Sequence, residues 1–177
     1  VYKRQGTFLK GKKHGKGIFT YKNGDSYEGD FRSGNMEGQG VYRFANGNIY
    51  HGEWKNDKSH GQGKYIFKNG DSYIGNFSNG EEDGKGIFTY SNGEKYEGEY
   101  KNGKRTGQGK FFFKNGNNYE GEFWDGIKNG KGKFIYPNGN IYDGEWKNDK
   151  REGKGTFTYA NGEKIIGVSE NDMKVNE

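Results

Sequence analysis

The stretch YHGEWKNDKSHGQGKYIFKNGDS, residues 50–72, recurs along this chain at a constant spacing of 23 residues. Complete copies begin at residues 4, 27, 50, 73, 96, 119 and 142, and a shorter copy begins at residue 165. No copy carries an insertion or a deletion. A fixed period of this length is typical of repeat proteins, in which each unit packs mainly against its neighbours.

The repeat register defines the domain organisation. We predict one array over residues 4–168, with complete repeats at 4–26, 27–49, 50–72, 73–95, 96–118, 119–141 and 142–164 and a partial repeat at 165–168. The polar residues 169–177 are predicted to form a C-terminal tail, which either caps the last strand edge or frays. Because the chain begins with Val1 rather than Met, we expect it to be a segment of a longer protein.

Composition restricts the fold to one that buries little. Only 28% of the residues are hydrophobic and 17% are aromatic, so the chain cannot build a thick core. Counting positions from the first residue of each copy, glycine occupies positions 3, 12, 14 and 21 of every complete repeat. Aromatic residues gather at positions 1, 5, 16 and 18, which are Tyr50, Trp54, Tyr65 and Phe67 in the third repeat. We infer that each repeat buries a small, defined set of rings.

Positions 1–6 and 14–19 alternate aromatic or glycine residues with polar ones, and this period of two indicates β-strands. We interpret the six residues between them, 56–61 in the third repeat, as a loop. The pairs that follow are Tyr50 with Phe67, Gly52 with Tyr65, and Trp54 with Gly63. No segment has helical periodicity. The predicted fold is all-β, an elongated single-layer antiparallel meander of β-hairpins.

Asn-Gly at positions 20 and 21 predicts a turn after the second strand of every repeat. The rings of successive repeats stay on one face only if this connection is odd in length. We therefore predict a three-residue loop whose glycine forms a left-handed bulge. Glycine at position 3 should leave bare backbone on which rings can lie. These structural glycines are Gly29, Gly52, Gly75, Gly98, Gly121 and Gly144.

The charge pattern argues against several classes of partner. The net charge of +5 comes from 29 basic and 24 acidic residues that are dispersed along the chain, so no basic stripe predicts a nucleic-acid partner. The absence of cysteine excludes disulfides and thiolate metal sites, and it fits a reducing compartment. No apolar run approaches the ~20 residues that span a bilayer.

The motif Tyr-x-Gly-Glu-Trp/Phe, followed by Gly-x-Gly-x-Tyr/Phe-x-Phe/Tyr and Asn-Gly, resembles the MORN repeat (membrane occupation and recognition nexus) over residues 4–168. The resemblance implies a scaffold rather than an enzyme. In members of that family, repeats have been proposed to bind anionic phospholipids, and in others they form protein-binding grooves or homodimers. The implied location is the cytoplasm, the cytoplasmic face of a membrane or the cytoskeleton. Departures from the pattern are Arg4, Thr7, Asp57, Asn76, Asp149 and Ile165.

Two functions remain open, and the first is favoured. In it, the aromatic face of a non-catalytic scaffold receives a helix or an extended peptide of a protein partner, because rings give large contact area at little cost in side-chain entropy. A single-layer sheet cannot bury both faces, so some rings should stay available. The candidate contacts are Tyr50, Trp54, Tyr65, Phe67, Tyr96, Tyr119, Phe123, Tyr142 and Trp146. A homodimer through the terminal repeats is a further partner that the resemblance implies.

In the second function, basic residues of the predicted loops contact the headgroups of anionic phospholipids and target a catalytic domain outside this segment to a membrane. The candidates are Lys128, Lys131, Lys150, Arg151 and Lys154. Acidic neighbours such as Asp149 and Glu152 interrupt this row, which weakens the case for lipid binding.

No residue set predicts catalysis, a cofactor or a metal. His14 and His60 share one repeat position but lie four strands apart, about 19 Å at ordinary strand spacing, too far to share a metal. The Gly-x-Gly at positions 12–14 lacks the helix and the lysine of a phosphate-binding loop. The acidic residues at position 4, such as Glu53 and Glu99, are expected to form a solvated rim.

Overall fold

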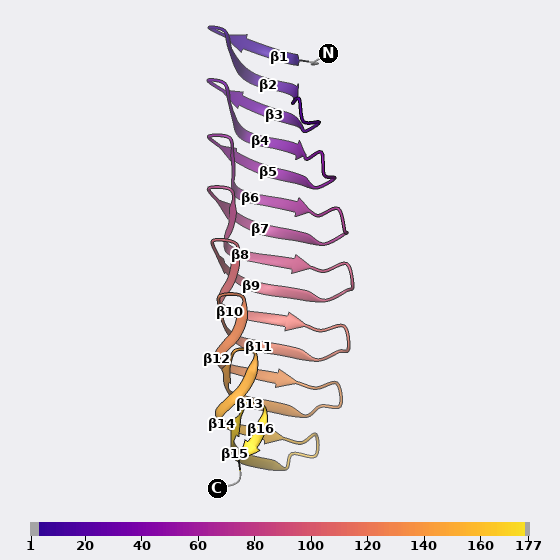
Figure 1. Cartoon of the computed structure of the whole chain (residues 1–177), viewed down its shortest axis with the longest axis vertical. Helices are drawn as coiled ribbons and strands as arrows, with labels where there is room; N and C mark the ends of the chain where they lie inside the picture. Colours follow the sequence, from indigo (N-terminus) through magenta and orange to yellow (C-terminus); the bar gives the residue numbers. More distant parts are fainter. Residues whose placement is uncertain (1–3, 176–177) are drawn as a thin grey trace. The chain divides into compact units, whose positions relative to one another are not determined.

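The computed structural model describes residues 4–175, which divide into two compact units between Ser91 and Asn92. The described residues contain strands and turns but no helix. Within each unit the strands follow one another in chain order, each antiparallel to the next (Figure 1). The predicted single-layer meander of hairpins is therefore confirmed.

The strands of the first unit are β1 (Arg4–Leu9), β2 (Lys12–Thr20), β3 (Ser26–Arg32), β4 (Asn35–Arg43), β5 (Ile49–Lys55), β6 (Lys58–Ile66), β7 (Ser72–Ser78) and β8 (Glu81–Thr89). Those of the second unit are β9 (Lys95–Lys101), β10 (Lys104–Phe112), β11 (Asn118–Trp124), β12 (Ile127–Ile135), β13 (Ile141–Lys147), β14 (Lys150–Thr158), β15 (Lys164–Glu170) and β16 (Met173–Val175). The lead-in residues 1–3 lie outside the described part of the chain.

The hairpin inside each repeat closes with a two-residue turn, so the predicted six-residue loop is wrong. Between β5 and β6 only Asn56 and Asp57 form the turn, and both have positive φ, 49° and 63°. Asn and Asp tolerate this left-handed conformation, and such turns match the twist of the flanking strands. The observed pairs are Tyr50 with Tyr65, Gly52 with Gly63, and Trp54 with Ser59, not the pairs predicted above.

The glycine-rich residues 61–63 belong to β6 and contain a β-bulge. The register shifts between Gly52 and Glu53, and two residues of β6, Gly61 and Gln62, have no partner on β5. Gly61 adopts a φ of 59°. Because the bulge adds two residues to β6, an even number, the rings on both sides of it remain on one face of the sheet.

The acidic side chains of Glu53 and Glu122 at position 4 close the bulge of their repeats, so the prediction of a solvated rim is wrong for these two residues. The amide of Gln62 donates to Glu53 Oε1 at 2.9 Å, and the amide of Lys131 donates to Glu122 Oε1 at 2.9 Å. Asn76 replaces the acid in one repeat and donates instead, from Nδ2 to the carbonyl of Lys85 at 3.2 Å. In these repeats the side chain at position 4 therefore stabilises the bulge.

The Asn-Gly connection is the predicted three-residue loop. The amide of Phe67 donates to the Asp71 carbonyl at 2.9 Å, and the amide of Gly70 donates to the Phe67 carbonyl at 3.0 Å. Gly70 has a φ of 91°, which favours glycine. The equivalent glycines also have positive φ, at Gly24, Gly47, Gly93, Gly116, Gly139 and Gly162. The prediction of a left-handed bulge is therefore confirmed.

Of the two alternatives predicted for the C-terminal tail, the described residues follow the capping of the last strand edge rather than fraying. Residues 169–170 complete β15, Asn171 and Asp172 form another two-residue turn, and β16 pairs back on β15. The carboxylate of Asp172 accepts the Arg151 amide at 2.9 Å, as the Asp149 carboxylate accepts the Lys128 amide at 2.9 Å. The partial repeat therefore extends beyond residue 168. Residues 176–177 lie outside the described range.

A line of glycines carries the buried rings. Gly52 pairs with Gly40 on one side and with Gly63 on the other. The fully buried Tyr50 ring lies over this glycine line, and its hydroxyl donates to the carbonyl of Glu53 at 2.9 Å. A Cβ built on Gly52 would meet Gly63 Cα at 2.5 Å. The predicted role of position 3 as bare backbone is therefore confirmed at Gly52, although the ring comes from the same strand.

Candidate protein-binding face

The aromatic face of each unit carries two rows of rings with different exposure. The inner row consists of positions 1 and 5, which are buried from the second to the seventh repeat, as Tyr50 and Trp54 are at 0% and 7% exposure. The outer row consists of positions 16 and 18, which are only half-buried in most repeats, as Tyr65 and Phe67 are. The outer row is therefore the part of this face that a partner can reach.

The inner row holds the repeats of a unit together. Tyr50 packs edge-on against Trp54 of its own repeat and against Phe77 of the next, with ring centroids 5.1 Å and 5.0 Å apart. Burial raises the pKa of its hydroxyl, as it raises the pKa of the Tyr96 hydroxyl to about 12. These tyrosines therefore stay neutral at physiological pH and serve the fold.

The outer row runs across the strands without interruption. In the first unit Phe44 lies 5.7 Å from Tyr65, Tyr65 lies 4.7 Å from Phe67, and Phe67 lies 5.7 Å from Phe88. In the second unit the same path links Phe113, Phe134, Tyr136 and Phe157. Each unit thus presents a track of rings at right angles to its strands.

Grooves lie beside this track. In the first unit a groove of about 390 Å³ has Tyr50 and Trp54 among its lining residues, together with Tyr65 and Phe67 of the outer row. Lys58 and Glu82 also line it. An apolar groove with a few charged groups at its border is typical of a binding site.

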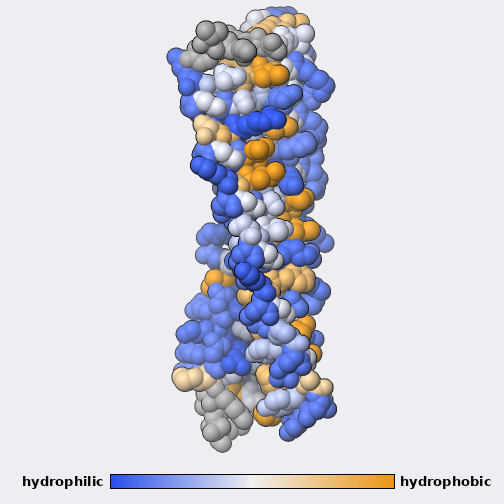
Figure 2. Space-filling model, turned by 90° about the vertical axis from the view of Figure 1, so that its right-hand side faces the viewer, coloured by the Kyte–Doolittle hydropathy of each residue, from blue (hydrophilic) through white to orange (hydrophobic). Residues whose placement is uncertain are grey.

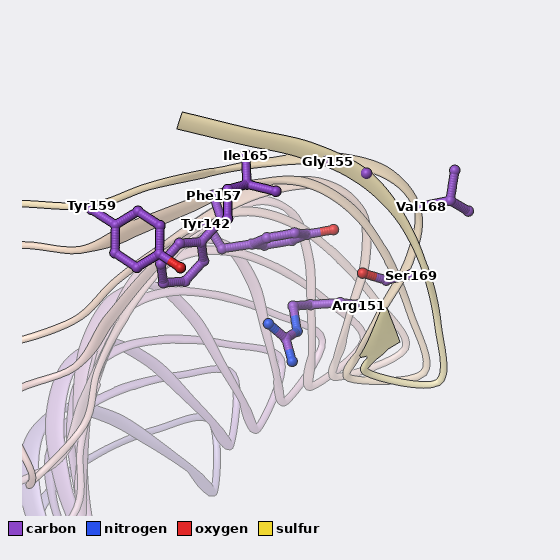
Figure 3. Close-up of a pocket in the computed structure, with 9 residues that line it drawn as sticks. Tyr142, Arg151, Gly155, Phe157, Tyr159, Ile165, Val168 and Ser169 are labelled. Carbon is purple, nitrogen blue, oxygen red and sulfur yellow. The ribbon is translucent and has the colours of Figure 1, made fainter. Parts of the chain in front are cut away.

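The second unit has a smaller groove of about 210 Å³ near its C-terminal end. Figure 3 shows the rings of Tyr142, Phe157 and Tyr159 on one side of the sheet, with the guanidinium of Arg151 extending toward them. Val168 points away from this group. The groove therefore combines aromatic walls with a cation.

The predicted partner-contact residues belong partly to the outer row and partly to the inner row. Tyr65 and Phe67 belong to the half-buried outer row, and Tyr50 and Trp54 also line the first-unit groove. The remaining predicted contacts belong to the buried inner row of the second unit: Tyr96, Tyr119, Phe123, Tyr142 and Trp146. Of these, Tyr142 also lines a groove.

The predicted lipid-contact residues do not share a loop. Lys128 and Lys131 lie on β12, and Lys150, Arg151 and Lys154 lie on β14. Lys131, Lys150 and Lys154 are exposed, whereas Lys128 and Arg151 are half-buried among rings. The loop placement predicted for this set is therefore wrong, because the intended loop is only two residues long.

Sequence analysis assigned position 10 to a loop, but in the structure it lies on the aromatic face. It pairs with the buried ring at position 5, as Ser59 pairs with Trp54 and Arg151 with Trp146. Paired residues of neighbouring strands project to the same face. The cations at position 10 can be seen when the copies are aligned, but their place on the aromatic face could not be predicted while this position was assigned to a loop.

The side of the molecule that carries the Asn-Gly turns is mostly polar. Figure 2, seen from the side of the Asn-Gly turns, shows hydrophilic residues over most of the surface, with apolar residues gathered in patches. None of the described residues forms a helix long and apolar enough to cross a membrane. Over residues 4–175, no group of three or more His, Asp or Glu side chains is placed to hold a metal ion.

The chain matches the MORN repeat family in seven consecutive segments, residues 5–26, 27–49, 50–72, 73–95, 96–118, 119–141 and 142–164. The comparison with curated proteins gives no match.

Among solved structures, the chain is similar to the TCP domain of SAS-4 (dCPAP) of Drosophila melanogaster in complex with a proline-rich motif of Ana2 (dSTIL). The two are 16% identical with a TM-score of 0.57, covering 96% of this chain and 90% of that one. The G-box domain of the microcephaly protein CPAP is 12% identical with a TM-score of 0.41, covering 86% of this chain and 98% of that one. At these identities the likeness concerns the fold alone.

Proposed function

Since this chain belongs to the MORN repeat family, we propose that it is a non-catalytic scaffold whose outer ring row binds an extended, proline-rich segment of a protein partner. The observation that carries the proposal is the track of half-buried rings that crosses the strands, with Tyr65 and Phe67 at its centre in the first unit.

The shape and chemistry of the track favour an extended peptide. Proline-rich segments adopt a polyproline II helix without internal hydrogen bonds and dock in grooves lined by aromatic side chains. Such a peptide needs little ordering on binding, which offsets part of the cost of association. The similar TCP domain was solved with a proline-rich motif of its partner, which supports the same class of ligand here.

Membrane contact is the competing function, and the structure gives it less support. The basic residues predicted for it are split between exposed strand positions and half-buried sites among rings. A flat bilayer surface would reach the first group but not the second.

The test compares two single substitutions of an apolar residue by serine on opposite faces of the sheet. Phe67→Ser removes a half-buried ring of the track. Ile74→Ser removes an apolar side chain that is 49% exposed on the opposite face, because Ile74 follows the buried Tyr73 on the same strand. Titration with a fluorescent proline-rich peptide should show roughly tenfold weaker binding for Phe67→Ser, the loss that a contact of about 1.4 kcal/mol gives, and unchanged binding for Ile74→Ser.

Both variants must keep the circular dichroism spectrum of the parent chain. Equal weakening by the two substitutions would contradict the assignment of the binding face. Binding to anionic vesicles with no binding of the peptide would favour the membrane function instead.

A further inference from the structure

In the three complete repeats of the second unit, position 10 forms a row of three cations on the aromatic face. The residues are Arg105 on β10, Lys128 on β12 and Arg151 on β14, one from each consecutive repeat. Lys128 Nζ lies 4.5 Å from the ring centre of Trp146 and 5.6 Å from that of Phe134. Lys128 therefore lies against rings of both the inner and the outer row.

Arg105 and Arg151 have the same kind of surroundings as Lys128. The guanidinium carbon of Arg105 lies 5.5 Å from the ring centre of Phe111 and 5.8 Å from that of Phe123, and that of Arg151 lies 5.4 Å from the ring centre of Tyr142. The three cations are thus recessed among rings rather than displayed on turns.

The first unit does not repeat this row. Its position-10 residues are Lys13, Met36, Ser59 and Glu82, which are a cation, an apolar residue, a hydroxyl and an anion. The fold therefore accepts any side-chain chemistry at this position. Three consecutive cations are a property of the second unit alone, and packing does not require them.

The acidic residues nearest to the row are Asp149 and Asp172, which belong to two-residue turns. Asp172 pairs with Arg151 at 3.2 Å, and its carbonyl also accepts the guanidinium at 2.9 Å. Asp149 accepts the backbone amide of Lys128 at the turn. Burial lowers the pKa of Lys128, and Asp149 and Asp172 offset this only in part. An additional anion beside Lys128 would therefore stabilise its charged form.

The spacing of the row matches one polypeptide conformation. Equivalent residues of consecutive repeats lie two strands apart, about 9.6 Å at the usual strand spacing. A polyproline II helix advances ~9.3 Å for every three residues. A carboxylate at every third residue would therefore meet one cation per repeat, while the residues between face the rings.

We propose that the second unit selects an acidic proline-rich segment with a carboxylate at every third residue, read by Arg105, Lys128 and Arg151. This proposal rests on the proposed function, since it assumes that an extended peptide follows the ring track. It specifies two further properties of the peptide, its negative charge and the three-residue spacing of its carboxylates.

A polypeptide fits this row better than a membrane or a nucleic acid. Arg151 exposes only 29% of its side chain, so a flat lipid surface would meet protruding residues such as Lys104, which exposes 60%. The +5 net charge of the chain is small for a phosphate-backbone ligand. A narrow peptide can enter the groove beside Arg151 and follow the ring track toward Lys128 and Arg105.

The experiment measures binding of three dye-labelled peptides to the full chain by fluorescence anisotropy. The peptides are four repeats of Glu-Pro-Pro, four repeats of Gln-Pro-Pro, and an isomer of the first in which all glutamates are contiguous. We expect the Glu-Pro-Pro peptide to bind at least roughly tenfold more tightly than either other peptide, because a hydrogen bond to a charged group gains that much.

The variant Lys128→Met keeps an unbranched side chain against the rings but removes the charge, and it should lose most of this preference. Arg105→Gln, which removes another cation of the row, serves as an independent second variant. The matched control is Lys133→Met, because Lys133 projects from the opposite face toward Asp143. It should bind all three peptides as the parent chain does.

Three results would overturn the proposal. Equal binding of the Glu and Gln peptides would leave the aromatic groove as a peptide site but remove the role of the cations. Equal binding of the two glutamate isomers would refute the three-residue period. No binding of any peptide would defeat the proposed function as well, and loss of binding to phosphatidylserine vesicles in Lys128→Met would then assign the row to lipid.

Discussion

Gly52→Leu is expected to lower the free energy of unfolding by ~3 kcal/mol, at the upper end of typical overpacking costs. A Cβ at this position would meet Gly63 Cα at 2.5 Å, the carbonyl oxygen of Gln62 at 2.6 Å and the Tyr50 hydroxyl at 2.7 Å. Two of these atoms belong to the backbone, which cannot move aside without breaking the strand pairing. Chemical denaturation followed by circular dichroism measures the change.

The matched control is His51→Ala, one residue away on the same strand. His51 is exposed on the opposite face, so its loss should change the free energy of unfolding by no more than about 0.5 kcal/mol. Glu53 is unsuitable as a control because its carboxylate accepts the Gln62 amide. Equal midpoints for Gly52→Leu and His51→Ala would show that the glycine line does not carry the rings.

Trp146→Ala is expected to lower the free energy of unfolding by ~3–5 kcal/mol, as large aromatic-to-alanine changes in a core do. Trp146 is only 6% exposed, packs against Tyr119 and Tyr142 at 5.2 Å and 5.5 Å, and donates from Nε1 to the Gly132 carbonyl at 2.9 Å. Its removal leaves a cavity and breaks this hydrogen bond.

Trp124 supplies the control in the same unit. Its side chain is 68% exposed, so Trp124→Ala should stay within about 0.5 kcal/mol of the parent chain. If both tryptophan variants unfold at the same denaturant concentration, Trp146 is not the core residue described here. The comparison also shows that substitution of Trp54 or Trp146 tests stability before it tests binding.

The sequence predicted the features that depend on a short local pattern. The Asn-Gly pair before Asp71 required a left-handed glycine, and the odd loop length followed from keeping Tyr65 and Tyr73 on one face. Both conclusions needed only the fixed period and the steric limits of the backbone.

The hairpin register could not be derived by the same means, because two turn signals competed. Gly-x-Gly at positions 12 and 14 resembles a loop, yet Gly61 is a bulge and Gly63 is a flat strand residue under the Tyr50 ring. The true turn signal was Asn79-Gly80, which favours a two-residue hairpin. The wrong choice assigned position 10 to a loop, so Lys128 and Arg151 were interpreted as lipid contacts and their location beside the rings was not predicted.

The sequence pattern also could not predict which of the aromatic positions are buried. Positions 1 and 18 both carry aromatic residues, but Tyr50 lies over bare backbone and is fully buried, whereas Phe67 lies at the end of its strand and stays half-buried. Only the three-dimensional register distinguishes a ring that serves the fold from one that a partner can touch.

The most direct test of the central claim, that the outer ring row is the binding face, is nuclear magnetic resonance of the full chain during titration with a proline-rich peptide. The account predicts that ring signals of Tyr65, Phe67 and Phe88 shift with added peptide while the methyl signals of Ile74 and Ile87 on the opposite face stay in place. Shifts of the Ile74 and Ile87 methyl groups without shifts of those rings would contradict it.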